Sequence, residues 1–427
     1  MSAMIHGESG SDSSGSRLEA VRSHNLALLA RTAVTSAQPL SRADLATSSG
    51  LSRSTVSRLV DTLIEHGILK EQASTRTNDA GRPSVPLVPS PHTHVAIGSE
   101  ITDSAIRVRV IDLGGHILAE YYREIHHTDN ANDVLSTLDE TLEKAEQQIL
   151  TSQMNLVGIA CGIPGLISPD DTTVYSAPSL GWHNVDISEL LKPSTHGTPY
   201  PIEIDNSINL SAFNEIVASQ RAGHPAQDFL FLSGSTGIGG AIVRHGEIEA
   251  GTHGWAGEFG HIPAHQSDAL CSCGQRGCLE TVAGRKALMT AGGFGPDDSI
   301  ANLYAALSRK DPKITKTITQ IGAVFGDVLS GVMNLLDLPE IRLGGILGQL
   351  YPYIQQPIME QVNRRVLYGT WAPIILSASR YGEESAADGG AWKMLLSFLA
   401  KPHTWRVPSD YALHYRDVDE TQEVTIE

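Results

Sequence analysis

The stretch GEFGHIPAHQSDALCSCGQRGCLE, from Gly257 to Glu280, places three of the chain's four cysteines within eight residues. These cysteines, Cys271, Cys273 and Cys278, follow His261 in the same stretch. Three thiolates and one imidazole complete a tetrahedral zinc site, and glycines between the cysteines allow the chain to fold back on itself. Four protein ligands leave no open position for a reacting molecule. The pattern therefore predicts a structural Zn2+.

Alternatives remain open for the nitrogen ligand and for the thiols. His253 and His265 lie close enough in sequence to replace His261 as the nitrogen ligand. Free thiols or a disulfide are the alternatives to a metal. Because the chain has only four cysteines and three of them are clustered, we expect no disulfide framework and a reducing, cytoplasmic location.

The charge of the chain limits where it can meet nucleic acid. The 427 residues carry a formal net charge of −17, and an acidic surface repels phosphates. Residues 1–90 nevertheless hold nine Lys and Arg against eight Asp and Glu, so any DNA contact belongs there. We find no apolar run of about 18 residues, and the start of the chain lacks the order of a secretory signal. We expect no membrane partner, and a disordered tail over residues 1–18.

Residues 19–90 predict a winged helix-turn-helix domain. A helical pattern around Leu45 ends at Ser-Ser-Gly, and Ser52 is a candidate N-cap for a second helix with an inward apolar stripe. A strand after Gly67 and a polar hairpin containing Arg82 follow, as in a wing. Hydroxyls and arginines on the outer face of the second helix suit phosphate and base-edge contacts. The predicted DNA-contacting residues are Arg42, Ser52, Arg53, Ser54, Thr55, Ser57, Arg58 and Arg82.

From Val95 onward, strand and helix patterns alternate, which predicts an α/β body. Two motifs in it resemble the ROK family of repressors and sugar kinases: AGEFGH at Ala256–His261 and CSCGQRGCLE at Cys271–Glu280. Supporting segments are GIPGLI at Gly162–Ile167, APSLGW at Ala177–Trp182, STGIGGAI at Ser235–Ile242 and LGGIL at Leu343–Leu347. The match covers about Arg22 to Leu399, and a winged helix before the body is typical of the family's transcriptional regulators.

The resemblance implies a two-lobed, actin-like (ribonuclease H-like) body with a sugar in its cleft. We expect a small lobe at 91–206 plus about 388–402, a large lobe with the zinc site at 207–387, and a C-terminal tail at 403–427. The implied sugar-contacting residues are Ser179, Asn206, Ser207, Glu258, His261 and Glu280. His261 would serve both the metal and the sugar.

Three departures from the kinases of the family argue against phosphoryl transfer. Ser207 stands where those kinases carry the aspartate base, and serine alone is no base at neutral pH. Asp205 lies one residue away, where we expect its side chain to point elsewhere. GSEITDSA at Gly98–Ala105 replaces an Asp-x-Gly-x-Thr phosphate loop, and Ser179 replaces a sugar-contacting asparagine. We therefore expect no catalytic residue and no enzyme activity.

These features together predict a regulator of transcription, namely a repressor of carbohydrate genes. Its expected partners are double-stranded operator DNA, a sugar or sugar phosphate effector, and further copies of itself in a homodimer or homotetramer. The apolar helical stretch at Ile314–Leu338 is a candidate for that contact, with an ordinary core helix as the alternative. Two other functions stay open: a sugar kinase with an added DNA-binding domain, and a regulator controlled by a partner protein.

Overall fold

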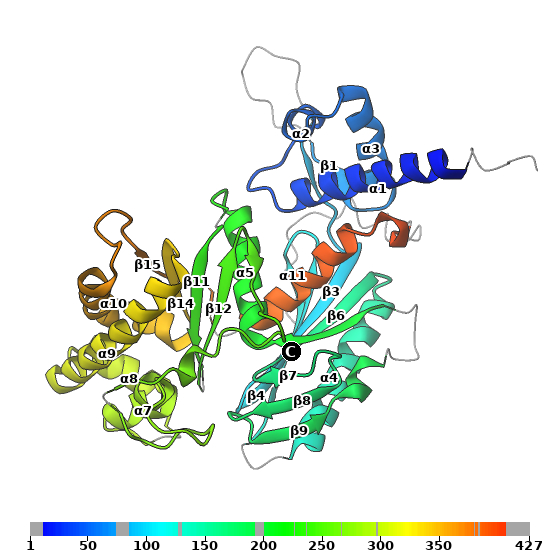
Figure 1. Cartoon of the computed structure of the whole chain (residues 1–427). Coiled ribbons are helices and arrows are strands. Elements are labelled where there is room, and N and C mark those ends of the chain that lie inside the picture. Colours follow the sequence, from blue (N-terminus) through cyan, green and yellow to red (C-terminus); the bar gives the residue numbers. More distant parts are fainter. Residues whose placement is uncertain are drawn as a thin grey trace, which may run out of the picture.

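The computed structural model describes residues 12–73, 85–126, 130–192, 200–225, 227–235, 237–265, 267–295, 298–379, 381–382 and 385–406 (Figure 1). The chain forms a small N-terminal domain and two larger α/β lobes. Each lobe is built around a five-stranded sheet.

The N-terminal domain contains three helices and a two-stranded sheet. Its elements are α1 (Asp12–Val34), α2 (Arg42–Ser49), α3 (Arg53–Glu65), β1 (Leu69–Glu71) and β2 (Leu87–Pro89). Ser41 caps α2 in a capping box with Asp44, and Gly50 ends that helix at φ +70°. Ser52 then caps α3 by accepting a hydrogen bond from the Thr55 amide. The antiparallel pairing of β1 with β2 forms the base of the expected wing.

Both ends of the described chain differ from the expectations. Helix α1 begins at Asp12, within the segment 1–18 that we expected to be a tail. The expected C-terminal tail begins with ordered residues, because Trp405 is buried. Arg82 and the tip of the wing lie outside the described residues.

The first lobe has a mixed five-stranded sheet in the order β10-β6-β3-β4-β5. Three strands form an antiparallel meander, and β6 and β10 continue the sheet in parallel with β3. A separate three-stranded sheet, β7-β8-β9, follows β6. The elements are β3 (His94–Ile101), β4 (Ala105–Asp112), β5 (Ile117–Glu124), α4 (Ala131–Thr151), β6 (Asn155–Ile163), β7 (Leu166–Ile167), β8 (Thr173–Ala177), β9 (Trp182–Asp186), η1 (Ser188–Leu191) and β10 (Ile202–Asn206).

The second lobe repeats this plan with the order β13-β12-β11-β14-β15. Again three strands form an antiparallel meander, and two more run parallel to its first strand. The elements are α5 (Ser207–Arg221), β11 (Phe229–Gly234), β12 (Ile238–Arg244), β13 (Glu247–Ile248), η2 (Phe259–His261), α6 (Glu280–Ala283), α7 (Arg285–Ala291), α8 (Ile300–Ser308), α9 (Pro312–Leu336), β14 (Glu340–Gly344), α10 (Gly345–Arg365) and β15 (Ile375–Ala378). Two lobes with the same strand plan are the actin-like architecture, which confirms the expected fold class.

The chain returns to the first lobe through α11 (Ser385–Leu399), which packs on β3, β6 and α5. A short helix, η3 (Pro402–Thr404), then leads to Trp405. One continuous hydrophobic core joins α11 and Trp405 to buried residues of the N-terminal domain. The N-terminal domain is therefore packed directly on the lobe that contains β3.

One described helix, α9, is long and apolar enough to cross a membrane. Half of its most apolar stretch is buried inside the second lobe, where Phe325 and Leu329 belong to the core. A buried core helix passes the same test of length and composition, so α9 is weak evidence for a membrane span.

Candidate functional site

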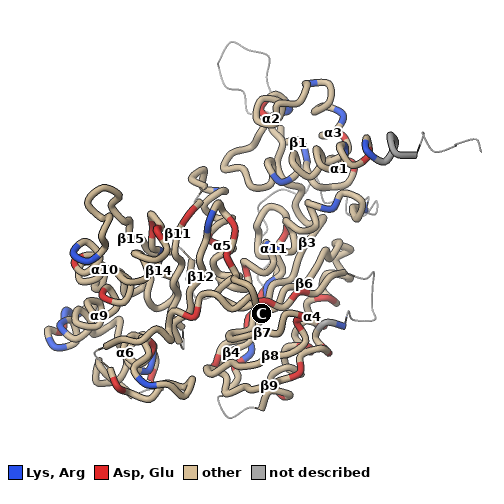
Figure 2. Tube along the Cα trace, viewed as in Figure 1, with Lys and Arg blue, Asp and Glu red and all other residues tan. Residues whose placement is uncertain are grey.

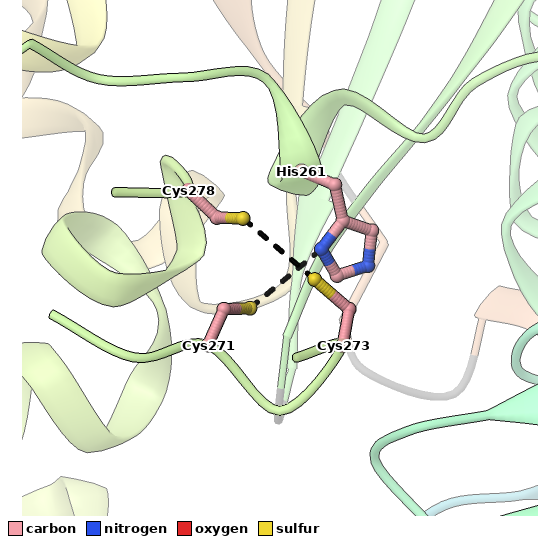
Figure 3. Close-up of side chains that lie close together, drawn as sticks. All are labelled: His261, Cys271, Cys273 and Cys278. Atoms are coloured by element: carbon pink, nitrogen blue, oxygen red, sulfur yellow. Dashed lines mark hydrogen bonds between the residues drawn. The ribbon is translucent and has the colours of Figure 1, made fainter. Parts of the chain in front are cut away.

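The structure gathers His261, Cys271, Cys273 and Cys278 into one cluster, whose ligand atoms all lie within 4.8 Å of one another (Figure 3). Cys273 Sγ lies 3.8 Å from Cys278 Sγ, and His261 Nδ1 lies 3.7 Å from Cys271 Sγ. Two sulfurs at about 2.3 Å from a tetrahedral zinc stand about 3.8 Å apart, so these spacings fit the ion. A disulfide requires about 2.05 Å between the sulfurs, and none of the four cysteines forms one.

The cluster of His261 and the three cysteines, called the metal cluster below, depends on glycines. They allow its loop to pack closely against β12. A Cβ on Gly257, at φ +111°, would lie 2.0 Å from the Gly240 carbonyl oxygen. A Cβ on Gly260 would lie 2.2 Å from the Ile238 carbonyl oxygen. Only glycine permits this approach, and the resulting path directs His261 toward the cysteines. Of the three candidate histidines, the structure brings His261 to the cysteines.

His253 has another contact. Its ring stacks on Trp255 at 5.0 Å between centroids, and Trp255 meets Tyr175 of β8 edge-on at 5.9 Å. Trp255 Nε1 donates a 2.7 Å hydrogen bond to the Ile167 carbonyl oxygen of β7. Trp255 follows β13 of the second lobe, whereas β7 and β8 belong to the first. This residue therefore joins the two lobes beside the loop of the metal cluster.

A cleft between the lobes adjoins the metal cluster. All six predicted sugar-contacting residues line it, namely Ser179, Asn206, Ser207, Glu258, His261 and Glu280. His261 has one ring nitrogen toward the cysteines, while Nε2 lies 3.8 Å from Glu258 Oε2. Burial raises the pKa of Glu258 and the charge of Glu280 acts in the same direction, whereas His261 opposes the rise. The cleft thus offers carboxylates, an amide and hydroxyls, which are the groups that recognise sugar hydroxyls.

Asn206 and Asp205 are both held by the fold at the start of α5. Asn206 Nδ2 donates to the Gly165 carbonyl oxygen at 2.9 Å, and its Oδ1 accepts from the Ile208 amide at 2.8 Å. Asp205 Oδ2 accepts from Lys393 Nζ at 2.9 Å, and Asp205 is absent from the cleft lining. Its side chain is therefore engaged by α11.

Ser207 lines the cleft as the first residue of α5. The residue is 5% exposed, and its Oγ has no hydrogen-bond partner among the described residues. Burying a hydroxyl without a partner is unfavourable. A ligand in the cleft would supply the missing partner.

Glu280 links the glycine-rich turn after β11 to the metal loop. Its Oε2 accepts from the Ile238 amide at 3.2 Å, and its Oε1 accepts from Ser272 Oγ at 3.2 Å. A Cβ on Gly237 would lie 2.2 Å from Glu280 Oε2. A carboxylate of the chain itself therefore lies where a glycine-rich turn otherwise approaches an anion.

Sequence reasoning missed several residues of the cleft. Asn209 and Ser211 lie two and four residues after Ser207 in α5, Tyr381 precedes α11, and Ser385 is the first residue of α11. Of the first pair, Ser211 carried a usable signal, because positions four residues apart share a helix face; Asn209, two residues from Ser207, does not share that face. The second pair comes from a distant part of the chain and had none.

The outer face of α3 carries most of the predicted DNA-contacting residues. Ser52, Arg53, Ser54 and Arg58 are exposed, whereas Thr55 and Ser57 are half-buried. No acidic residue lies in the first turn of this helix. Figure 2 shows basic residues along α1 and α3 and mixed charge over both lobes. This face is suited to a DNA backbone.

Arg42 has partners inside the domain. It forms an ion pair of 2.8 Å with Asp61 of α3 and a second ion pair with Glu71 of β1. These contacts join α2, α3 and the wing. Its role in DNA binding stays a prediction, and the structure gives this arginine a positioning role as well.

Helix α3, the predicted recognition helix for DNA, is connected to the cleft through β3. At the start of this strand, buried His94 accepts a 2.9 Å hydrogen bond at Nδ1 from Asn155, so Nε2 donates to the His66 carbonyl oxygen at 2.8 Å. His66 caps the end of α3. At the other end of the strand, Glu100 and Ile101 line the cleft. A single strand therefore connects the cleft with the end of the recognition helix.

Comparisons with known proteins agree with this arrangement. The sequence model of the ROK family matches residues 96–395, and that of the IclR helix-turn-helix domain matches residues 27–73. The chain is 26% identical to the xylose repressor of Bacillus subtilis over 363 residues, covering 84% of this chain and 92% of the repressor. It is 24% identical to a glucokinase of Halalkalibacterium halodurans over 313 residues, covering 69% of this chain and 93% of the kinase.

A crystal structure of a ROK family transcriptional regulator, a homologue of the Escherichia coli Mlc protein, shares the fold. It superposes with a TM-score of 0.71 at 24% identity, covering 93% of this chain and 99% of the other. The ROK match spans most of the sequence, and the helix-turn-helix match precedes it. The chain therefore belongs to the ROK family and has the domain arrangement of the family's transcriptional regulators.

Proposed function

We propose that this protein is a DNA-binding repressor of carbohydrate genes whose cleft binds a sugar effector. One observation carries the proposal: the six residues predicted to contact a sugar line a single cleft, which β3 connects to helix α3. The likeness to repressors over most of the chain supports it. Its partners are double-stranded operator DNA, the effector and further copies of itself, in the cytoplasm.

The metal cluster is proposed to hold one structural Zn2+. His261, Cys271, Cys273 and Cys278 would supply all four ligands. When bound, the ion would fix the loop from Gly257 to Glu280, and with it the side of the cleft formed by Glu258 and His261. No ligand position would remain for a substrate.

The effector would act by changing how the lobes meet. A sugar held between Glu258 of one lobe and the loop that contains Ser179 of the other favours a closed cleft. Closure moves the cleft end of β3, and the contact between His94 and His66 transmits that movement to α3. A ligand shifts such an equilibrium only by its difference in affinity for the two states.

We propose that the cleft does not transfer phosphate. By the family resemblance, Ser207 would stand where the kinases carry their base, and the nearby Asp205 is paired with Lys393. Glu100, which lines the cleft, lies in the segment that would replace the phosphate loop of those kinases. A glutamate there would repel a nucleotide.

The charges of the cleft favour an effector without phosphate. Its described lining includes four carboxylates and no Lys or Arg; the four are Glu100, Asp103, Glu258 and Glu280. A phosphate group in the cleft would lie close to these carboxylates, whose negative charge repels it. Of the two effector classes expected from the sequence, the uncharged sugar is therefore the one we propose.

Calorimetric titration of the purified full chain tests this function. The panel pairs glucose and N-acetylglucosamine with their 6-phosphates and adds xylose. Glu258→Gln should weaken binding of the sugar at least about 10-fold, because it removes a charged hydrogen-bond acceptor. Glu249→Gln is the matched control, since Glu249 is absent from the cleft lining.

Binding of an unphosphorylated sugar, weakened by the first change alone, supports the proposal. Tighter binding of a 6-phosphate contradicts the effector class, and no binding by any member contradicts the sugar cleft. A coupled assay for ADP release, run with the same sugars and ATP, should show no turnover. Sustained turnover by the wild type would instead make the protein a sugar kinase.

A further inference from the structure

Helix α5 extends from the cleft to the N-terminal domain. Its N-cap Asn206 and its first residue Ser207 line the cleft, and Arg221 lies in its last turn. The 15 residues of the helix, at a rise of about 1.5 Å each, span about 22 Å. Val217, one turn before Arg221, belongs to the hydrophobic core that α11 shares with the N-terminal domain. The two ends of α5 therefore contact two different parts of the protein.

The Arg221 side chain joins segments that are far apart in the sequence. Its guanidinium donates a 2.8 Å hydrogen bond to the carbonyl oxygen of Val34, the last residue of α1. It also donates to the Gly114 carbonyl oxygen in the turn between β4 and β5. Its Cζ lies 4.9 Å from the ring centroid of Trp392 in α11, in a cation–π contact. One side chain of α5 thus holds α1, the β4–β5 turn and α11 together.

The surroundings of Arg221 fit it closely. Burial lowers the pKa of Arg221, and the charge of the fully buried Asp112 opposes that shift. The last carbonyl groups of a helix lack partners inside it and favour a cation, and the guanidinium meets this need at Val34. A Cβ on Gly115 would lie 2.9 Å from the Trp392 ring and 3.3 Å from the guanidinium. A glycine in the turn therefore makes room for both side chains.

Helix α5 also contacts both lobes near the cleft. A Cβ on Gly239 of β12 would lie 2.4 Å from Ile208 Cγ1, so the helix packs closely on the second lobe there. A Cβ on Gly389 of α11 would lie 1.8 Å from the Leu210 carbonyl oxygen. When lobes close on a ligand, packed helices slide past one another by small amounts. A helix held by both lobes then moves relative to at least one of them, and Arg221 at its end moves with it.

We propose that Arg221 is a positioning residue that couples occupancy of the cleft to the orientation of the N-terminal domain. This role rests on the proposed function, since it requires an effector in the cleft and DNA on the N-terminal domain. His94 of β3 contacts the end of α3, whereas Arg221 of α5 contacts the end of α1. Hydrogen bonds to two different helices control how the domain is turned, because a domain held at one point can rotate about it.

The test measures how strongly a sugar changes DNA binding by the full chain. Fluorescence anisotropy gives the dissociation constant for a labelled fragment from upstream of the protein's own gene, at fixed salt. It is measured without sugar and with saturating glucose, N-acetylglucosamine or xylose, and the ratio of the two constants is the coupling factor. Calorimetry gives the affinity for each sugar alone.

Arg221→Met keeps an unbranched side chain beside Trp392 and removes both hydrogen bonds. We expect its affinities for sugar alone and for DNA alone to stay within about 3-fold of the wild type. Its coupling factor should fall at least about 5-fold, since coupling between sites is typically about 5- to 150-fold. Arg221→Lys keeps the charge but lacks the planar fork that reaches two carbonyl groups, so its coupling factor should lie between the other two. A purely structural role would change stability and leave this factor as it is.

Arg365→Met is the matched control. Arg365 also lies in the last turn of a helix, α10, but it pairs with Asp327 of the same lobe at 2.6 Å. This variant removes an arginine that contacts neither the cleft nor the N-terminal domain. It should therefore keep the wild-type coupling factor.

A coupling factor that Arg221→Met lowers and Arg365→Met keeps supports the proposal. A folded Arg221→Met protein with the wild-type factor overturns it and leaves the proposed function intact, as does one that has lost either binding activity by itself. If the wild type responds to none of the three sugars, the proposed function fails and the role of Arg221 fails with it. Should Arg221→Met not fold, Arg221→Lys takes its place: a factor about 3-fold below the wild type supports the proposal, and an equal factor overturns it.

Discussion

His261 lies between the two parts of the site. Its Nδ1 faces the cysteine sulfurs and its Nε2 faces Glu258 at the cleft. A metal at Nδ1 would fix the orientation and the tautomer of the ring, so that the other nitrogen stays available to the cleft. Metal content and sugar affinity should therefore change together.

Cys273→Ser tests this link. Serine is a much poorer zinc ligand than cysteine, so zinc measured by mass spectrometry should fall from about one per chain to nearly none. Sugar affinity should fall with it, and the melting temperature should drop by about 5 °C or more as the loop loosens.

Cys161→Ala is the matched control for that change. Cys161 is fully buried in β6, and burial raises the pKa of its thiol to about 11. This variant should retain the metal. A Cys273→Ser protein that keeps one zinc, or wild type without zinc when purified without chelators, would exclude the proposed ligand set.

Arginines of the N-terminal domain are expected to have two different roles, contact with DNA and ion pairing within the domain. Arg53 and Arg58 are exposed on α3, so replacing either with alanine should weaken DNA binding and reduce the salt slope by about 0.9 if it contacts one phosphate. Arg42→Ala should leave that slope unchanged and lower the melting temperature slightly, because Arg42 pairs with Asp61 and Glu71. Fluorescence anisotropy at several salt concentrations measures the slopes. A reduced slope for Arg42→Ala would assign this residue to the DNA contact.

At the scale of single residues, sequence motifs predicted the chemistry of the site, but not which residues lie next to one another in space. The cysteine spacing indicated a metal, but three histidines remained candidates. The choice among them follows from the path of the loop over β12, which the sequence does not show. Ser385 and Tyr381 reach the cleft only because the chain returns to it near α11, and no local pattern reveals such a return.

At the scale of elements, β3 has a different partner at each end. Its first residue, His94, contacts the cap of α3 and packs against Phe398 of α11 at 4.9 Å between ring centroids. Its last residues line the cleft. Alternation of strand and helix patterns predicted β3. The contacts of Trp405 with α11 were not expected, because Trp405 belongs to the segment that we expected to be a C-terminal tail.

The buried His94 makes this junction sensitive to acid. Burial lowers the pKa of His94 to about 4, from about 6.5 in an unfolded chain, although the hydrogen bond to the His66 carbonyl oxygen acts in the opposite direction. The unfolded state therefore binds the proton more readily, so stability is full above about pH 6.5 and falls as pH drops toward about 4. From about pH 7 to about pH 5 the loss is about 2 kcal/mol.

His94→Gln should remove this part of the acid sensitivity. A glutamine amide can replace both hydrogen bonds and does not titrate in this range. Denaturant unfolding at the two pH values should show a smaller loss for the variant than for the wild type, by about 2 kcal/mol. Equal losses in the two proteins would show that His94 is not the titrating group.

At the scale of the whole molecule, two repeated lobes place the cleft at the carboxyl ends of their parallel strands. The order of the sheets cannot be read from strand patterns alone, and it was the resemblance to a family that predicted two lobes. The arrangement leaves separate surfaces for the two proposed partners. These surfaces are the α3 face for DNA and the cleft for the effector.

The most direct test of the account is the anisotropy of a labelled DNA fragment from upstream of this protein's own gene. The fragment is titrated with protein at fixed salt, with and without the unphosphorylated sugar that binds the cleft, because phosphate contacts make affinity depend on salt. The account predicts tighter binding than to random DNA, and release by that sugar but not when Glu258 is replaced with Gln. If the protein binds this DNA specifically but no sugar that binds the cleft changes its affinity for the DNA, the proposal of a sugar-responsive repressor is contradicted.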